Sequence, residues 1–186
     1  MKHWKILNSE YLVHAPWAVL RKDRCLMPNG HVVPDYYVLE YPNWVNMVAL
    51  TEEGEFILVR QYRHAVGEEV LEIPGGVIDE GETALEAAHR ELLEETGYVF
   101  EETLQLNSLF PNPATANNTT FTFLMKGGRK IQEQHLDPQE ELDVLIVTPS
   151  ELLRLLRSNQ FGQALHTAAL FYALLELGWL VDPLDS

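Results

Sequence analysis

Apolar and polar residues alternate with different periods along the chain, and the periods predict its elements. β-branched and aromatic residues within 17–41 flank a turn at 28–30, which predicts short β segments. The apolar runs 44–50 and 56–63 predict a hairpin, because the stretch between them is polar and contains a glycine. Two later runs of alternating residues predict further strands, at 119–125 and 142–147.

Helices are predicted from the residues at their ends. Thr83 and Glu86 have the spacing of a capping box, in which each side chain bonds to the main-chain N–H of the other residue. Gly97 can adopt the left-handed conformation that ends a helix. A second capping box is expected at Thr148 and Glu151, with proline at the first helical position between them.

The remaining apolar segment, 163–177, predicts a third helix that is closed by Gly178. Strands and helices are mixed without regular strand–helix–strand alternation, so we expect α+β layers rather than a doubly wound sheet. No repeat or Pro/Gly/Ser-rich linker divides the 186 residues, which are enough for one domain with a full core. We therefore expect an N-terminal β extension over 1–42 and one domain over 43–186.

Composition and charge narrow the classes of function. The chain has 28 Asp+Glu against 13 Lys+Arg and a net charge of -15, which argues against binding nucleic acid through its phosphates. The single cysteine, Cys25, cannot form an internal disulfide. Neither a signal sequence nor an apolar run of about 18 residues is found, so we expect a cytoplasmic protein without a membrane partner.

Negative charge is concentrated in one part of the chain. Within 64–125 the only basic residue is Arg90, whereas Glu91, Glu94 and Glu95 fall on one edge of the first predicted helix. Like charges at this spacing repel each other, and a divalent cation with oxygen ligands would neutralise them. The alternative is a solvated acidic helix face, which is the commoner explanation of such a charge run.

The spacing of residues over the longer stretch 76–98 favours a bound cation over a solvated acidic face. Gly76 is followed by five residues and Glu82, then by seven residues and the run from Arg90 to Tyr98. This pattern resembles the signature of the Nudix hydrolases, Gly-x5-Glu-x7-Arg-Glu-U-x-Glu-Glu-x-Gly-U, where U is a bulky apolar residue. Every fixed position is matched.

The flanking residues resemble one branch of that family, the ADP-ribose pyrophosphatases. Residues 59–63 and 71–76 look like the lead-in of this branch, and Pro113 sits where the branch carries a proline. Two departures are visible. The branch usually reads Pro-Ala-Gly where this chain has Pro-Gly-Gly at 74–76, and Ser-Pro-Gly where it has Asn-Pro-Ala at 112–114, which leaves the sugar specificity open.

The resemblance implies a Nudix-type α/β/α sandwich with a mixed central sheet. It also implies metal-dependent hydrolysis of the pyrophosphate bond in a nucleoside diphosphate linked to a sugar, giving a nucleoside monophosphate and a sugar phosphate. Mg²⁺, with Mn²⁺ as a substitute, would be held by Glu91, Glu95 and the carbonyl of Gly75, with Glu94 as an additional or water-mediated ligand. A homodimer is implied as well, because this branch commonly builds its nucleotide pocket with N-terminal strands of two subunits.

Other roles are assigned with their alternatives. Arg63 can grip two phosphate oxygens of the diphosphate, or it forms an ion pair with a nearby glutamate. By resemblance, Glu72 accepts from a ribose hydroxyl, and the general base lies before a late strand, where Glu140 is favoured and Glu141 is close behind. The alternative is that Glu140 and Glu141 are charged loop residues without a role in catalysis, since a base must reach the attacking water by a hydrogen bond. Four residues would support the motif, among which Glu82 orients the loop or joins the metal shell: Gly76, Glu82, Arg90 and Gly97.

Two other activities stay open for this chain. One is a hydrolase of GDP-sugars or dinucleoside polyphosphates. The other is a non-catalytic Nudix module that binds a nucleotide and regulates a partner. The three metal-binding glutamates speak against the second, because such modules commonly lose them.

Overall fold

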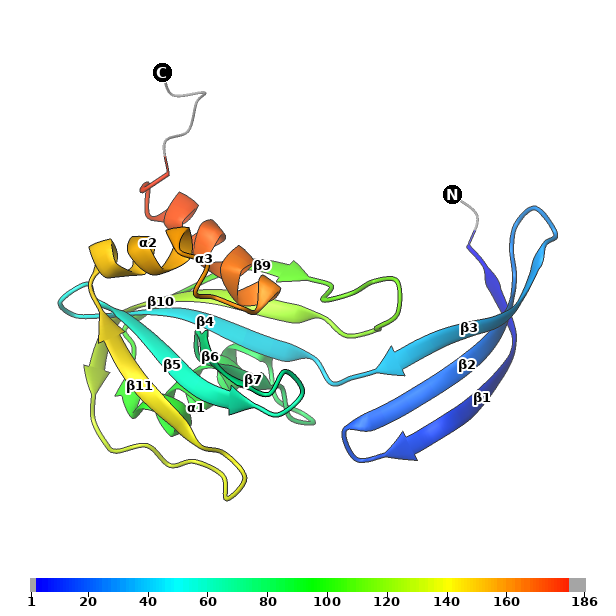
Figure 1. Ribbon diagram of the computed structural model, residues 1–186, viewed down its shortest axis with the longest axis horizontal. Coiled ribbons are helices and arrows are strands. Elements are labelled where there is room, and N and C mark those ends of the chain that lie inside the picture. Colours follow the sequence, from blue (N-terminus) through cyan, green and yellow to red (C-terminus); the bar gives the residue numbers. More distant parts are fainter. Residues whose placement is uncertain (1–2, 181–186) are drawn as a thin grey trace. The chain divides into compact units, whose positions relative to one another are not determined.

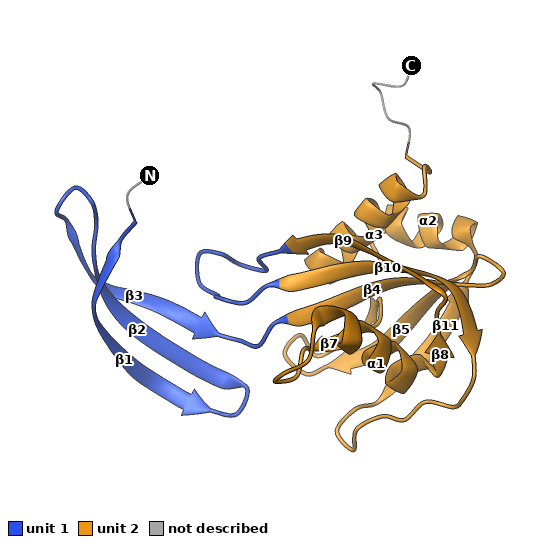
Figure 2. Ribbon diagram, turned by 180° about the vertical axis from the view of Figure 1, so that it is seen from behind, with its two compact units in different colours: residues 1–43, 109–119 blue, residues 44–108, 120–186 orange. Residues whose placement is uncertain are grey.

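The computed structural model describes residues 3–180, which divide into two compact units (Figures 1 and 2). Unit 1 comprises 3–43 together with 109–119, and unit 2 comprises 44–108 and 120–180. The division differs from the expected extension over 1–42 in that a distant loop joins the N-terminal strands. The ends of the two expected domains, residues 1–2 and 181–186, lie outside the described residues.

Unit 1 is a three-stranded antiparallel sheet. Its strands follow the chain order, β1 (Lys5–Ala15), β2 (Ala18–Leu26) and β3 (Val32–Glu40). The loop 109–119 is hydrogen-bonded to β3, since the Leu39 N–H donates to the Thr115 carbonyl at 2.7 Å. These main-chain bonds explain why a loop far along the chain belongs to the N-terminal unit.

The residue pattern did not predict β1, because it indicated β segments only within 17–41. Every residue of β1 is exposed, so no buried face imposes an alternating pattern. The pairing of β1 with β2 shifts register between Ile6 and Asn8 and again between Tyr11 and Val13. Such bulges place neighbouring apolar residues together and break the period of two.

Unit 2 contains a mixed eight-stranded sheet. The mixed sheet is the one that the family resemblance implies, and the sequence predicts four of its strands, β4, β5, β10 and β11. The strands run in the order β11-β5-β4-β10-β8, with β6 beside β5, β7 beside β4 and β9 beside β10. The central strand β4 is parallel to β10 and antiparallel to β5. The bounds are β4 (Trp44–Thr51), β5 (Phe56–Arg63), β6 (Glu68–Glu72), β7 (Gly75–Val77), β8 (Tyr98–Val99), β9 (Glu102–Leu109), β10 (Thr120–Lys130) and β11 (Leu142–Val147).

Helices cover both faces of this sheet (Figure 1). The helix α1 (Ala84–Thr96) packs on one face, and α2 (Pro149–Arg157) and α3 (Ala164–Glu176) pack on the other. Successive residues of β4 point to opposite faces, so Met47 is buried with α1 and Val48 with the other two helices. The predicted α+β class and sandwich are confirmed. None of the helices within 3–180 has the length and apolar character that a membrane crossing requires.

The helix ends follow the sequence closely, with one exception. Thr83 and Glu86 form the complete capping box, and Gly97 ends α1 with φ of 77°. At α2 the Thr148 hydroxyl accepts from the Glu151 N–H at 3.3 Å, but the Glu151 carboxylate bonds to Arg154 instead of reaching back. The second capping box is therefore only half formed, because a guanidinium one turn away offers the carboxylate a charged partner.

Candidate active site

Two glycines let the main chain of β7 lie close to its neighbours, Gly76 to α1 and Gly75 to β4. A Cβ at Gly76 would overlap the carboxylate of Glu91, and a Cβ at Gly75 would overlap the Val45 carbonyl. No other residue type fits either position without displacing these groups. The close approach lets the Gly75 N–H donate to Oε2 of Glu95 at 3.1 Å. The structure thus brings together Gly75, Glu91 and Glu95, which the sequence proposed as metal ligands.

Arg90 lies at the centre of the motif. Its Nε donates to Oε1 of Glu82 at 2.9 Å, and its Nη1 donates to Glu91 at 2.9 Å and to Glu94 at 3.1 Å. Its Nη2 donates to the Val77 carbonyl at 2.9 Å and to Glu82 at 3.0 Å. The hydrogen bonds to Glu82 are the largest cause of a raised Arg90 pKa, and the same bonds lower the pKa of Glu82. Arg90 therefore ties the loop before α1 to the glutamates on it.

Glu95 is only 6% exposed. Burial raises the pKa of Glu95 well above its usual range, and the charges of Glu91 and Glu140 raise it further. The Gly75 N–H and the Arg63 charge oppose this shift. A carboxylate so placed favours a bound cation, because the cation would restore the stability of its ionised form.

The candidate metal ligands, which are the carboxylates of α1 and the Gly75 carbonyl, are all oxygen donors, the kind that a hard divalent ion prefers. Burial also raises the pKa of Glu91, to about 7, against the opposing charge of Arg90. Glu94 is more peripheral, with 44% of its side chain exposed. Within 3–180 no three His, Cys, Asp or Glu side chains gather into a ready-made metal cluster. Mg²⁺ commonly takes one or two carboxylates and substrate oxygens, so Glu91, Glu95 and the Gly75 carbonyl offer ligands of the right kind.

Arg63 and Glu72 form a two-pronged ion pair at the end of β5. Nε of Arg63 donates to Oε1 of Glu72 at 3.0 Å, and Nη2 donates to Oε2 at 2.6 Å. Of the two alternatives for Arg63, the structure shows the ion pair, and Nη1 makes no hydrogen bond to the described part of the chain. Glu72, which the resemblance expects to accept from a ribose hydroxyl, is 3% exposed, and its carboxylate holds Arg63. The bond to Glu72, together with the charges of Glu95 and Glu140, raises the Arg63 pKa.

His166 on α3 is a neighbour of this pair that sequence reasoning treated as structural. It is 6% exposed, and its Nδ1 has no hydrogen-bond partner among residues 3–180. Burial lowers the pKa of His166 to about 4, with the Glu72 charge raising it and the Arg63 charge lowering it. Nothing in the sequence distinguishes this histidine, because α3 is apolar on most sides and gives no spacing signal.

The loop 131–141 carries the expected general base. The Glu140 charge is among the smaller causes that raise the pKa of Glu91 and of Glu95, and the Glu140 carboxylate accepts from the Asp137 N–H at 3.3 Å. Glu141 is exposed directly before β11. Pro113, the expected substrate contact further along the chain, lies in the loop of unit 1.

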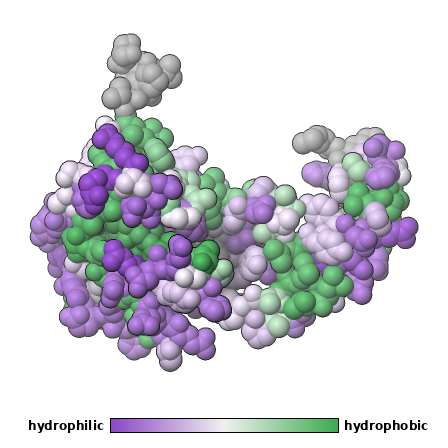
Figure 3. Space-filling view, viewed as in Figure 1, coloured by the Kyte–Doolittle hydropathy of each residue, from purple (hydrophilic) through white to green (hydrophobic). Residues whose placement is uncertain are grey.

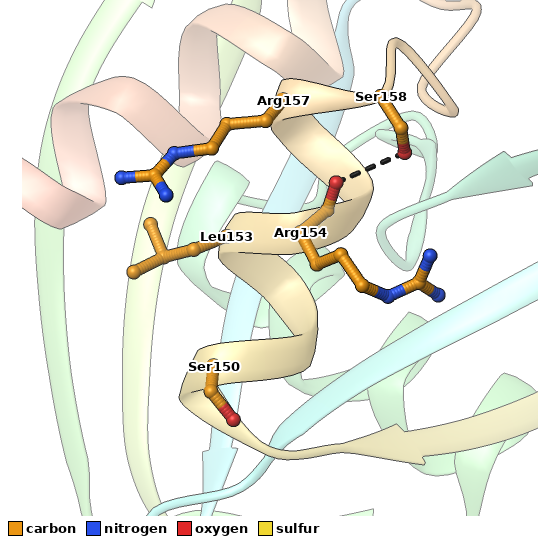
Figure 4. A pocket seen from close by; sticks show the side chains of 5 residues that line it. All are labelled: Ser150, Leu153, Arg154, Arg157 and Ser158. Carbon is orange, nitrogen blue, oxygen red and sulfur yellow. Dashed lines mark hydrogen bonds between the residues drawn. The ribbon is translucent and has the colours of Figure 1, made fainter.

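A separate depression of about 430 Å³ lies on α2 (Figure 4). Arg154 on its wall is already bonded to Glu151 at 2.9 Å, and the Ser158 hydroxyl donates to the Arg154 carbonyl at 2.9 Å. Because α2 covers the sheet face opposite α1, this depression is not part of the carboxylate site. It is lined by Ser150, Leu153, Arg154, Arg157 and Ser158.

Comparison with known proteins agrees with this geometry. The NUDIX domain family matches residues 41–168, and the nucleoside diphosphate sugar hydrolase N-terminal domain matches 4–39. An ADP-ribose pyrophosphatase of Bacillus subtilis (strain 168) is 30% identical over 151 residues, 81% of each chain. A methanol dehydrogenase activator of Bacillus methanolicus is 28% identical over 173 residues, 92% of this chain and 93% of the relative.

The fold recurs in a solved structure. The crystal structure of an ADP compounds hydrolase superposes with a TM-score of 0.84 and 24% identity, over 97% of this chain and 98% of the other. The complete signature from Gly76 to Tyr98, the mixed sheet between helices and the family match over 41–168 lead to one conclusion. This chain belongs to the Nudix family.

Proposed function

We propose that this protein hydrolyses the pyrophosphate bond of a nucleoside diphosphate linked to a sugar, of the ADP-ribose type. The products are a nucleoside monophosphate and a sugar phosphate. The observation that carries the proposal is the close approach of β7 to the motif glutamates: the Gly75 N–H donates to Glu95 at 3.1 Å, and Gly76 lies against the Glu91 carboxylate. The curated relative in Bacillus subtilis that carries the name ADP-ribose pyrophosphatase supports the substrate class.

Nudix hydrolases are generally dependent on divalent metal ions, and we propose Mg²⁺ here, with Mn²⁺ as a substitute. Glu91, Glu95 and the Gly75 carbonyl would hold the ion, with Glu94 as an outer or water-mediated ligand. When bound, such an ion polarises the phosphoryl oxygens and offsets their negative charge as they approach the carboxylates. Arg90 has no free N–H for substrate in this arrangement, so its part is to hold the glutamates.

The remaining residues act on the substrate and on water. Arg63, held by Glu72, has no partner for Nη1 among residues 3–180, and this group donates a strong charge-assisted hydrogen bond to a phosphate oxygen of the substrate. Glu140 accepts a proton from the attacking water, and Glu141 is the alternative base. Glu72 and Pro113 stay proposed substrate-binding residues.

A homodimer in the cytoplasm is the proposed assembly. Unit 1 exposes large apolar and aromatic side chains on its strands and turn, among them Ile6 at 59%, Tyr11 at 51% and Trp17 at 74%. Hydrophobic surface, drawn in green, is visible on this unit in Figure 3. An exposed sheet with such residues favours association with a second copy. Light scattering is expected to give twice the mass of 21.3 kDa, and a monomer would refute the dimer. The cytoplasmic setting is supported by the single, buried and unpaired cysteine, Cys25.

A substrate panel tests the activity. Purified protein is incubated with ADP-ribose, other ADP-sugars, a GDP-sugar and a dinucleoside polyphosphate, each with Mg²⁺, with Mn²⁺ and with a chelator. We expect mononucleotide release that is fastest from ADP-ribose or an ADP-sugar and absent with the chelator. Faster release from the GDP-sugar or the dinucleotide would select the alternative hydrolase. No release from any substrate would favour the regulatory module. The similarity to the methanol dehydrogenase activator of Bacillus methanolicus is the reason to include this alternative.

A further inference from the structure

One side chain links the helix of the metal-binding glutamates to the loop of the proposed base. The Gln134 carboxamide donates through Nε2 to the main-chain carbonyl of Glu95 at 2.7 Å and to that of Leu142 at 3.3 Å. The first carbonyl lies in the last turn of α1, and the second belongs to the first residue of β11. A carboxamide has two N–H donors, so one side chain serves both carbonyls.

The contact belongs to a larger seam between the loop and the helix. The last carbonyls of a helix have no partner within it, and no basic residue lies in the last turn of α1. The loop supplies the donors instead, because the His135 N–H donates to the Glu94 carbonyl at 2.8 Å and the Ile131 N–H to the Gly97 carbonyl at 2.9 Å. Gln134 adds a donor from a side chain to these main-chain donors.

The stretch between Gln134 and β11 is otherwise held by few bonds. Glu140 donates its N–H to the Asp137 carbonyl at 2.9 Å, and the Asp137 N–H donates back to the Glu140 carboxylate at 3.3 Å. These bonds shape a local turn but do not connect it to α1. Gln134, together with the His135 N–H, holds the start of this stretch to the helix, and through Leu142 it also holds the end of the stretch to the strand.

We propose that Gln134 is a positioning residue that sets the place of Glu140 relative to Glu91 and Glu95. The inference rests on the proposed role of Glu140 as general base. Gln134 does not touch the reacting atoms and acts only through the loop. The two accepting groups are main-chain carbonyls, so the role needs a donor at this position and is lost with an apolar side chain of the same length.

Gln134→Met tests the proposal, with Gln132→Met as the matched control. Gln132 is exposed on the same loop, and its side chain makes no hydrogen bond within 3–180. We expect Gln134→Met to lower kcat about tenfold, part of the 10²–10⁴-fold that a general base contributes, with KM and Mn²⁺ affinity within about twofold of wild type. Amide hydrogen exchange in 131–141 should become several-fold faster. The control should change none of these quantities.

A double-mutant cycle with Glu140→Gln separates positioning from general damage. If Gln134 acts through Glu140, the methionine variant causes no further loss of kcat in the Glu140→Gln background. An equal loss in that background, weaker Mn²⁺ binding or unchanged amide exchange would overturn the positioning role.

The proposed function can fail separately. Full kcat in Glu140→Gln alone would show that Glu140 is not the general base. The hydrogen bonds of Gln134 would then have no catalytic group to position. Absence of any hydrolysis by the wild type would overturn the proposed function, whereas the exchange measurement would still report whether Gln134 holds the loop.

Discussion

The arginines at 63 and 90 lie in two regions of unit 2 that both collect glutamates, yet they use their N–H groups differently. Arg90 donates from all three of its nitrogens, to Glu82, Glu91, Glu94 and the Val77 carbonyl. Arg63 donates from Nε and Nη2 to Glu72 alone and keeps Nη1 free of protein partners within 3–180. A guanidinium has five N–H donors in a fixed fork, so the first region is saturated and the second can still bind a ligand.

The difference separates a structural arginine from a binding arginine. Around Arg90 one positive charge faces four carboxylates within 4 Å, those of Asp79, Glu82, Glu91 and Glu94, so negative charges outnumber positive ones in this region. Around Arg63 the single partner is buried, and 40% of the arginine side chain is exposed. A cation is therefore expected beside the first region and an anionic substrate beside the second.

The largest expected effect is the loss of a buried carboxylate from the first region. Glu95→Gln removes the charge that would bind the metal ion and keeps the shape, so we expect kcat to fall by about 10³-fold or more. The free energy of unfolding should not fall, because burial disfavours the ionised form of Glu95. Nucleotide release at saturating Mg²⁺ and thermal unfolding measure the two quantities. The exposed turn residue Glu53→Gln is the control, and full activity of Glu95→Gln would end the metal assignment.

Paired lysine substitutions test the contrast between the arginines directly. Arg63→Lys keeps a charge but cannot hold Glu72 and a phosphate together, so we expect kcat/KM to fall about 30-fold, mainly through KM. Arg90→Lys should instead lower the free energy of unfolding by about 2 kcal/mol, less than for a fully buried pair because Arg90 is partly exposed. Steady-state kinetics and denaturant unfolding distinguish them. The contrast fails if Arg90→Lys changes KM more than Arg63→Lys does.

The smallest expected effect is the pH dependence of stability that comes from His166, which lies near Arg63 and Glu72. The His166 pKa is lowered to about 4 in the folded protein and is about 6.5 when unfolded, so its stabilising contribution is present above pH 6.5 and is lost as pH falls toward 4. Between pH 7 and 5.5 wild type should lose about 1 kcal/mol more unfolding free energy than His166→Leu, which cannot titrate. Urea unfolding at both pH values measures the difference. Equal losses in the two proteins would show that His166 does not titrate in this range.

Much of the fold was predictable where the signals are local. Thr83, Glu86 and Gly97 mark both ends of α1 because a cap depends on neighbours within a few residues. The strand β1 was not predictable, since its residues are exposed on both faces and its bulges hide the alternation. The prediction that the Glu151 carboxylate completes a capping box with Thr148 was wrong, because this carboxylate accepts from Arg154 instead.

The candidate site divides in the same way. Spacing alone placed Glu91, Glu94 and Glu95 on one helix, since 3.6 residues per turn determine which positions are neighbours. It did not identify the carboxylate that Arg63 holds, although it left an ion pair open. It also gave no sign of Gln134, whose partners are main-chain carbonyls that any residue type supplies.

The family motif, the caps of α1 and the concentration of negative charge on that helix can be read from the sequence, because spacing along a helix is set by the local backbone geometry. The tertiary structure adds which of these charges are buried, which arginine has an N–H without a partner within 3–180, and which loop contacts the helix of the glutamates. Burial and hydrogen bonds between β5, β6, α1, α3 and the loop 131–141 depend instead on how segments far apart in the chain pack together.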